Sequence, residues 1–417
     1  MGSLGREDFR LRTMSRQSES SCRCGCKSTS GKSAGQHPLR FCSTLIEMYI
    51  ERLRLYNFRN LADAELHPEP GVNLITGQNG QGKTNLIEAL FVLATGKSFR
   101  TSNHKELPSR DSKEASVFAD VRSHDGERLF ELGLAISAGK RQGYFNKKRA
   151  ASLIEYFGRL ACVAFYPQDV MIIKGAPSLR RRFFDRHMAG CFPSTLEALS
   201  RYEKALMAKN ALLSEKGTEP SLLDPWNAIL AEYGHQIRMQ RERFLARLSE
   251  QAQAILKTLS GDREVLGLSI LSRDPASEII TAEAILEQLH RAKPAELRQK
   301  KCLIGPHRDD ILITLNGADS RAYASQGQSR SLILALKLAT ISLIEQERGE
   351  APLILLDDVD SELDSERAQA LLSLLLKDGR QTFITATSAE RMMGLRGGCP
   401  VKHFEVASGQ IMPRNYL

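Results

Sequence analysis

The stretch Gly77-Gln78-Asn79-Gly80-Gln81-Gly82-Lys83-Thr84 decides the fold of this sequence. An apolar run over residues 72–76 precedes it, and residues 85–94 place apolar side chains at helical spacing. A glycine-rich segment between a strand and a helix is the context of a phosphate-binding loop, because its N–H groups can surround phosphate oxygens at the positive end of the helix dipole. We predict that Lys83 contacts the β- and γ-phosphates and that Thr84 ligates Mg²⁺. The predicted nucleotide-binding residues of this loop are Gly77, Gln78, Asn79, Gly80, Gln81, Gly82, Lys83 and Thr84.

A second segment supplies two carboxylates directly after the apolar run 353–356. Asp357 ends this predicted strand, so its carboxylate should lie beside the phosphates and bind Mg²⁺, through water. Asp358 should point elsewhere and position or polarise the attacking water. A Glu is common at this position in related ATPases, and the shorter Asp suggests slow hydrolysis. The alternative is a solvated acidic loop, since Asp360, Glu362 and Asp364 follow.

The third segment is Ser325-Gln326-Gly327-Gln328, which opens the long apolar helix predicted over residues 329–345. A Ser hydroxyl and a Gly N–H at a helix start can bind an anion, although ordinary helix capping is the alternative. In this order the three segments indicate an ATPase of the ABC type. In such a head the serine-led helix lies far from the phosphate loop of its own chain. We therefore predict that Ser325, Gly327 and Gln328 bind the γ-phosphate of ATP held by a second copy, giving an ATP-dependent homodimer.

Two further residues are candidates for the site. Gln168, in Tyr166-Pro167-Gln168-Asp169, is predicted to sense the metal and the nucleophilic water, and an ordinary loop glutamine is the alternative. Arg59, in Asn57-Phe58-Arg59-Asn60, is predicted to contact the phosphates, and a surface charge is the alternative.

Residues 1–47 differ in composition from the rest of the 417-residue chain, being rich in Ser, Arg, Gly and Cys without periodicity. We expect a mis-assigned start before Met48, and a disordered basic arm or a transit peptide are the alternatives. The whole chain has a net charge of +9, which suits a nucleic-acid partner. Removing the eight Lys/Arg and four Asp/Glu of this segment from the 58 basic and 49 acidic residues leaves only +5.

The remaining periodicity predicts an α/β fold: an ABC-type ATPase head, with a mixed sheet that carries the P-loop, and a helical second lobe. The head consists of residues 48–176 and 300–417, and the lobe of residues 177–299. Predicted strands cover residues 50–55, 72–76, 116–121, 129–136, 162–165, 311–315, 353–356 and 382–385, with a hairpin over 143–149. Predicted helices cover residues 85–94, 196–215, 226–259, 329–345 and 366–376. No apolar run approaches the roughly 20 residues that span a bilayer, and no signal peptide is recognisable, so we expect a cytoplasmic protein.

Two basic runs, Arg180-Arg181-Arg182 and Lys147-Lys148-Arg149, are interpreted as solvated faces or as contacts to DNA phosphates that read no sequence.

Several motifs together resemble the RecF family of bacterial DNA replication and repair proteins, from Met48 nearly to Leu417. They are Asn57-Phe58-Arg59-Asn60, the phosphate loop, the run 180–185, Gly305-Pro306-His307-Arg308-Asp309-Asp310, the run 325–330 and the run 355–364. The resemblance implies ATP and Mg²⁺ as cofactors and ATP-dependent dimerisation on DNA at gaps or junctions between double and single strands. It also implies slow, DNA-stimulated ATP hydrolysis, work with RecR and RecO to load RecA onto SSB-covered strands, and a link to the SOS response.

The sequence departs from many ABC enzymes in lacking a His after the strand at 382–385, so Thr385 or Thr387 is expected to replace it. The segment 305–310 is expected to form a polar turn that meets the partner head. Other functional classes are the ATP-binding subunit of an ABC transporter and a chromosome-structuring scaffold. The helical lobe and the lack of a membrane segment disfavour the first, and the absence of long paired arms disfavours the second.

Overall fold

The phosphate-loop strand β3 (Val72–Thr76) is central to a six-stranded sheet of order β15-β14-β3-β13-β12-β8. The computed structural model describes residues 48–123, 129–217, 219–260, 263–272, 281–358, 375, 380–389 and 401–414, and they belong to one compact unit. Neighbouring strands pair in parallel except for the antiparallel edge strand β15. The other strands of this sheet are β8 (Cys162–Phe165), β12 (Leu353–Leu356), β13 (Thr382–Ala386), β14 (Val401–Ala407) and β15 (Gln410–Arg414).

Strand β12 shows why this sheet has a continuous apolar sequence. Its side chains alternate between two hydrophobic cores, with Leu353 and Leu355 in one and Ile354 and Leu356 in the other. All four residues are buried because both faces of the sheet are covered. A strand buried on both faces needs apolar residues at every position, which is the pattern of parallel sheets.

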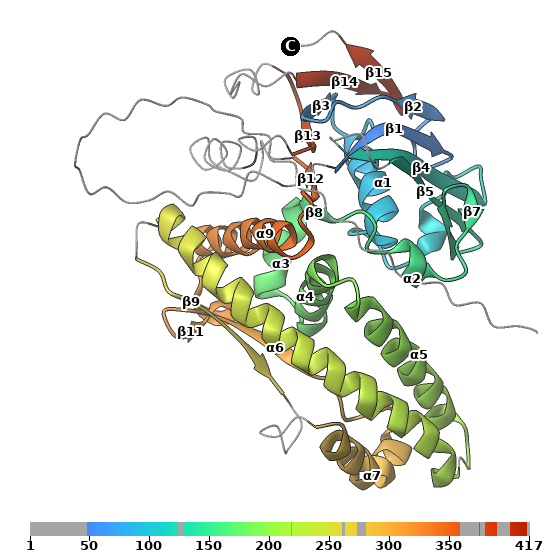
Figure 1. The fold of residues 1–417 in the computed structure, drawn as a ribbon, viewed down its shortest axis with the longest axis vertical. Helices are drawn as coiled ribbons and strands as arrows, with labels where there is room; N and C mark the ends of the chain where they lie inside the picture. The colour runs from blue at the N-terminus through green and yellow to red at the C-terminus, as the bar shows by residue number, and fades with distance from the viewer. Residues whose placement is uncertain are drawn as a thin grey trace, which may run out of the picture. The chain divides into compact units, whose positions relative to one another are not determined.

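One face of the mixed sheet is covered by α1 (Lys83–Thr95), which also packs against an antiparallel sheet of order β2-β1-β4-β5-β6-β7. Figure 1 shows α1 between these two layers of strands. Residues 86–94 of α1 are all buried, as two sheets on opposite sides require. The strands of the antiparallel sheet are β1 (Met48–Tyr56), β2 (Ala64–Leu66), β4 (Glu114–Ser123), β5 (Leu129–Ser137), β6 (Lys140–Phe145) and β7 (Lys148–Arg149).

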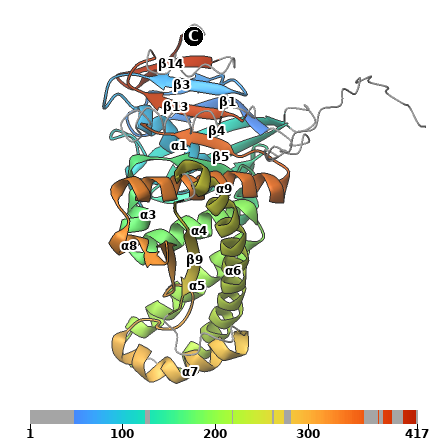
Figure 2. The ribbon, with the colours of Figure 1, turned by 90° about the vertical axis from the view of Figure 1, so that its left-hand side faces the viewer.

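The other face of the mixed sheet is covered by α9 (Gln326–Arg348), which packs against α3, α4, α6 and β8. A three-stranded antiparallel sheet of order β11-β10-β9 belongs to the same core. Figure 2 shows α9 crossing below the strands, with α8 near one of its ends. The additional elements of this region are η2 (Pro167–Asp169), α3 (Val170–Lys174), α4 (Pro177–Cys191), β9 (Leu266–Leu271), β10 (Asp310–Leu315), β11 (Ala318–Asp319) and α8 (Ser320–Tyr323).

The helical lobe is built around α6 (Asp224–Ser260), a helix of 37 residues. Its first half contributes Leu230 and Ile237 to a core that it shares with α5 and α7. Its second half contributes Phe244 and Leu248 to the core beneath α9. One continuous helix therefore belongs to two cores. The remaining elements are η1 (His104–Glu106), α2 (Leu153–Tyr156), α5 (Thr195–Ser214), η3 (Pro220–Leu223) and α7 (Ala282–Gln299).

The α/β fold with a helical region is confirmed, and most predicted elements are present within a few residues of their expected bounds, including the hairpin β6–β7. Strand β9 was not predicted: it lies in the chain segment assigned to the helical lobe but pairs along its whole length with β10. The boundaries at 176/177 and 299/300 remain predictions. Residues 1–47, the helix predicted over 366–376 except for residue 375, and Ser361-Glu362-Leu363-Asp364 lie outside the described residues.

Candidate nucleotide-binding site

The loop from Gly77 to Thr84 joins β3 to α1, as the sequence predicts. Gly77 has φ +149°, and a Cβ built there would lie 2.2 Å from the carbonyl oxygen of Val406 in β14. No L side chain fits this position, because the neighbour is rigid backbone and the φ is unfavourable. The ammonium of Lys83 points back into the loop and donates to the carbonyls of Gly77 (2.5 Å) and Gln78 (3.1 Å). The loop therefore positions a cation where phosphate oxygens would lie.

The loop is braced by residues that the sequence analysis did not assign to the site. The Asn60 amide donates to the carbonyls of Gly80 and Gln81, at 3.4 Å each. From the other side, the turn between β14 and β15 donates the Ser408 N–H to the Gln81 side chain at 2.5 Å. Asn60 belongs to the motif Asn57-Phe58-Arg59-Asn60, so its role could have been predicted together with that of Arg59. Nothing in the sequence indicates a role for Ser408.

Asp357 and Thr84, 273 residues apart in sequence, meet at the carboxyl end of β12. The Thr84 hydroxyl donates to Asp357 Oδ1 at 3.1 Å, and the Thr385 hydroxyl donates to the same oxygen at 2.8 Å. Asp357 is only 6% exposed, and its burial raises the pKa of the carboxyl group while both hydroxyl donors oppose that shift. Asp357 thus lies in a buried polar site at the sheet edge, whereas Asp358 is half-buried and Asp360, Glu362 and Asp364 lie outside the described residues.

The oxygen atoms of Thr84 and Asp357 fit a Mg²⁺ site. Mg²⁺ prefers oxygen ligands in octahedral geometry and usually keeps several waters. Because the Thr84 and Asp357 oxygens lie 3.1 Å apart, a Mg²⁺ bound by the Thr84 hydroxyl would place a bound water within reach of the Asp357 carboxylate, as predicted. Within the described part of the chain, no three His, Cys, Asp or Glu side chains gather into a metal site. Such a Mg²⁺ would therefore take its remaining ligands from phosphates and water, as Mg²⁺ commonly does.

Asp358 has a left-handed backbone, with φ +52°. Its N–H donates to the Thr385 hydroxyl at 2.8 Å, so Thr385 binds both acidic residues at once. Left-handed non-glycine residues are strained and cluster at functional sites. This geometry gives Thr385, one of the two residues expected to replace the missing His, a defined place in the site.

Gln168 lies three residues after the end of β8 and is exposed in η2. Strand β8 pairs with β12, and the Asp357 N–H donates to the Phe165 carbonyl at 2.8 Å, so the Gln168 turn begins beside the acidic pair. The adjacent Asp169 is buried and forms an ion pair with Lys337 of α9. Burial lowers the pKa of Lys337 to about 8, although the Asp169 carboxylate opposes this. The role predicted for Gln168 remains a prediction.

Arg59 forms a two-pronged ion pair with Glu88 of α1, at 3.0 and 2.8 Å, and also donates to the Glu106 carbonyl. Glu88 is fully buried, and the Arg59 side chain is 18% exposed. Arg59 is therefore not a surface charge; in the structure it neutralises a buried carboxylate on the helix that follows the phosphate loop. Its predicted phosphate contact remains a prediction.

Ser325 is the N-cap of α9 and forms a capping box with Gln328. Its hydroxyl accepts the Gln328 N–H at 3.1 Å, and the Gln328 side-chain amide donates to Glu264 at 3.0 Å. Among the residues that the structure describes, no hydrogen bond joins 325–328 to the loop 77–84. Ser325 itself is exposed, while Gly327 is half-buried. The γ-phosphate contact of these three residues remains a prediction.

The interpretation of the run 180–182 is wrong for Arg180, which is buried, whereas Arg181 is half-buried and Arg182 is exposed. Arg180 is 4% exposed and holds Asp310 with two hydrogen bonds of 2.8 and 2.7 Å. Asp309 is fully buried and receives two hydrogen bonds from Arg238 of α6. Asp309 and Asp310 therefore belong to an ionic junction between α4, α6 and β10, whereas His307 and Arg308 of the segment 305–310 are half-buried. The predicted contact of this segment with a partner head remains a prediction. Lys147, Lys148 and Arg149 are exposed on the β6–β7 hairpin.

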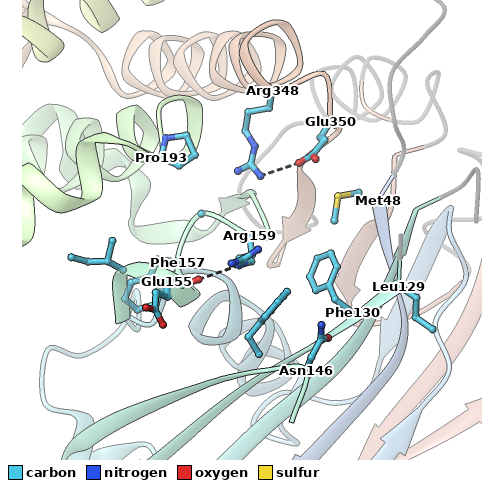
Figure 3. Close-up of a pocket in the computed structure, with 13 residues that line it drawn as sticks. Met48, Leu129, Phe130, Asn146, Glu155, Phe157, Arg159, Pro193, Arg348 and Glu350 are labelled. Carbon is cyan, nitrogen blue, oxygen red and sulfur yellow. Dashed lines mark hydrogen bonds and ion pairs between the residues drawn. The ribbon is translucent and has the colours of Figure 1, made fainter. Parts of the chain in front are cut away.

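A cavity of about 660 Å³ lies apart from this site. Figure 3 shows Met48, Phe130 and Phe157 on its wall, together with Arg159. The Arg159 guanidinium stacks 4.0 Å from the centroid of the Phe145 ring. None of the predicted nucleotide-binding residues lines this cavity, so it is separate from the nucleotide site.

Comparisons with known proteins agree with this geometry. Residues 49–405 match the family model described as the RecF/RecN/SMC N terminal domain. The chain is 39% identical to the DNA replication and repair protein RecF of Bacillus subtilis over 352 residues, which covers 82% of this chain and 94% of that protein. It is 38% identical, with the same coverage, to RecF of Staphylococcus epidermidis.

Solved structures give the same result. A structure of the recombination mediator protein RecF-ATP in the RecFOR pathway matches with a TM-score of 0.78 and 34% identity, covering 88% of this chain and all of that chain. An Smc head bound to the C-winged helix domain of ScpA matches with a TM-score of 0.51 at 17% identity, which shows a shared fold. The chain has the ABC-type ATPase head fold and belongs to the RecF family of DNA replication and repair proteins.

Proposed function

We propose that this chain is a DNA-binding ATPase of recombinational repair and replication, two copies of which close around ATP at gaps or junctions in DNA. The observation that carries this proposal is the division of the site between two places in the chain. The cradle and the acidic pair meet through the 3.1 Å bond between Thr84 and Asp357, whereas exposed Ser325 opens a helix on the opposite face of the sheet. A second copy would bring its own Ser325 to the cradle.

In the proposed reaction, Lys83 binds the β- and γ-phosphates and the loop N–H groups hold their oxygens. Mg²⁺ held by Thr84 and Asp357 would neutralise charge on the transferred phosphoryl group. Asp358, fixed by Thr385, and Gln168 orient the attacking water. Ser325, Gly327 and Gln328 of one copy contact the γ-phosphate held by the other, so hydrolysis releases the dimer. We propose that hydrolysis is slow and is stimulated by DNA.

The wider role follows from the family. We propose a cytoplasmic protein that works with RecO and RecR to load RecA onto SSB-covered single strands and so supports the SOS response. RecF relatives are DNA replication and repair proteins, and one solved relative is placed in the RecFOR pathway. No helix among the described residues is long and apolar enough to cross a membrane.

The central test is sedimentation velocity of the full chain with and without ATP and gapped DNA. The wild type should dimerise only with ATP, and Ser325→Arg should keep ATP binding as a monomer yet fail to dimerise. Ser221→Arg, an exposed serine in η3 of the lobe, is the matched control and should behave as wild type. Loss of ATP binding in Ser325→Arg would count against a shared site.

A second variant tests the cradle. Lys83→Ala should lose nucleotide binding itself, measured by titration of a fluorescent nucleotide, because the phosphate charge is then uncompensated. Unchanged affinity would remove the phosphate-loop assignment. RecA filament assembly on SSB-covered gapped DNA, with RecO and RecR present, then tests the proposed pathway.

A further inference from the structure

Lys337 lies in the middle of α9 and is fully buried. Lysine is almost never fully buried unless its charge is paired, because removing the ammonium from water is costly. Its neighbours on the helix, Leu336 and Leu338, belong to the hydrophobic core. Replacing a buried ion pair by apolar residues is often neutral or stabilising, so the stability of the fold does not account for a charge at this position. A role in the nearby site is the other explanation.

The Lys337 ammonium contacts both the end of β8 and the turn η2 that follows it. It donates to the Ala164 carbonyl and to Asp169 Oδ2. It also lies 5.1 Å from the centroid of the Phe165 ring and 4.6 Å from the centroid of the Tyr166 ring. A cation is attracted to an aromatic face, and more strongly where water is excluded. One side chain of α9 therefore holds this stretch of the chain, and Figure 1 shows α9 next to β8 and α3.

The Asp169 carboxylate also closes the turn that carries Gln168. Asp169 Oδ2 accepts the Tyr166 N–H at 2.9 Å, and the Asp169 N–H donates to the Tyr166 carbonyl at 3.0 Å. The Tyr166 ring stacks on the Phe99 ring, with centroids 4.6 Å apart and planes 11° from parallel. Among the described residues, the exposed Gln168 side chain makes no hydrogen bond. The position of Gln168 therefore depends on the backbone of the turn.

The start of the turn is fixed to the acidic pair. Strand β8 pairs with β12 along its length, and the Asp357 N–H donates to the Phe165 carbonyl at 2.8 Å. The chain thus leaves the sheet beside the acidic residues and is bound by Lys337 immediately afterwards. A change in the Lys337 contacts would shift Gln168 relative to the water that, by our proposal, Asp358 orients.

We propose that Lys337 is a positioning residue for ATP hydrolysis: its bonds to Asp169 and to the Ala164 carbonyl hold the turn so that Gln168 reaches the attacking water. This inference rests on the proposed function, which gives Gln168 its role, and adds the side chain that sets its place. Because Lys337 belongs to the helix that Ser325 opens, a displacement of α9 would also displace Gln168.

The test is single-turnover ATP hydrolysis with gapped DNA by the full chain. Lys337→Met/Asp169→Asn removes the ion pair without leaving a buried charge unpaired, and the asparagine oxygen can still accept the Tyr166 N–H. Hydrolysis should slow on the order of a hundredfold, because a displacement of about 1 Å can have that effect. The affinity for fluorescent ATP should equal that of the wild type, since the phosphate loop is unchanged.

The matched control removes another fully buried ion pair of the same kind. Lys209→Met/Glu296→Gln does so in the helical lobe and should leave hydrolysis at the wild-type rate. Equal slowing in this control would overturn the positioning role, because the loss of any buried pair would then have the same effect.

A Gln168→Ala background separates positioning from a general packing defect. Once the Gln168 side chain is gone, the Lys337→Met/Asp169→Asn change should slow hydrolysis no further, because residues that act through one another are not additive. Slowing by the same factor in both backgrounds would contradict the proposal. If the pair variant does not fold, Asp169→Asn replaces it, since a lysine without its carboxylate can lose its proton and stay buried.

The remaining outcomes distinguish this inference from the proposed function. Wild-type hydrolysis by the pair variant, or by Asp169→Asn in its place, together with slow hydrolysis by Gln168→Ala would overturn the role of Lys337 and leave that of Gln168 intact. Wild-type hydrolysis by Gln168→Ala would overturn both roles together.

Discussion

The Thr385 hydroxyl is hydrogen-bonded to both acidic residues of the site, so Thr385→Val tests what these two bonds contribute. Valine keeps the shape of the side chain but removes the donor to Asp357 Oδ1 (2.8 Å) and the acceptor of the Asp358 N–H (2.8 Å). A hydrogen bond to a charged group contributes about 1.5–3 kcal/mol, and a buried N–H left without a partner costs about 1–3 kcal/mol. The added methyl group returns roughly 0.8 kcal/mol. The folded state should lose about 2–5 kcal/mol.

The effect on catalysis should be larger than the effect on binding. Asp358 has a left-handed backbone, and without its N–H bond it should move away from the position in which, by our proposal, it orients the attacking water. A displacement of about 1 Å in such a group can reduce kcat on the order of a hundredfold. ATP affinity should change little, since Lys83 and the loop are untouched.

The assay is single-turnover ATP hydrolysis with DNA, together with thermal unfolding. Thr385→Ser keeps the hydroxyl and should recover most of the rate, which separates the hydrogen bonds from a general packing defect. A Thr385→Val protein with wild-type kcat would refute the proposal that Thr385 holds Asp358 in its catalytic position. Equal defects in the Ser and Val variants would refute the hydrogen-bond argument.

Three other perturbations have defined outcomes. Asp309→Asn removes the carboxylate charge that pairs with buried Arg238 and should cost about 3–5 kcal/mol in urea unfolding. Exposed Asp111→Asn should stay within about 0.5 kcal/mol, and similar midpoints for the two variants would contradict the buried junction. His307 is desolvated, which lowers its pKa to about 4. The unfolded chain binds this proton near pH 6.5, so the free energy of unfolding should fall by about 3 kcal/mol as the pH drops from 6.5 to 4. In His307→Gln the free energy of unfolding should lack this pH-dependent decrease, which urea unfolding of both proteins across that pH range would check. Gly77→Ala should abolish binding of fluorescent ATP, because the new Cβ overlaps the Val406 carbonyl. Gly217→Ala, which has open space around it, should keep wild-type affinity. ATP binding by Gly77→Ala would show that the phosphate loop can adopt a different backbone conformation.

The sequence predicted well the elements whose burial can be inferred from a short run of neighbouring residues. Residues 353–356 are apolar throughout because both faces of β12 are covered. The glycine-rich loop likewise predicts a strand before it and a helix after it. Strand β9 was missed because the whole segment 178–292 was interpreted as helical, although Leu266, Leu268 and Ile270 alternate with Gly267 and Ser269 as in a strand. Its pairing with β10, which is distant in the sequence, is a tertiary contact that a local pattern does not give.

Charged residues were the main source of error in the site. Arg180 reads as part of a solvated run until Asp310, 130 residues away, is placed against it. Arg59 has the same ambiguity, because its partner Glu88 lies on a helix face whose burial depends on two sheets. Burial of a charge depends on its partner, and single-sequence patterns do not identify partners.

The length of α6 has a consequence for how this protein can be altered. Since the helix donates Leu230 to one core and Phe244 to the other, removing the lobe would strip side chains from the interior beneath α9. Evolutionary or engineered insertions and deletions should therefore be confined to the connection between α5 and α6, where Gly217 and η3 form the tip. An excised head would have to carry the C-terminal half of α6 with it in order to fold.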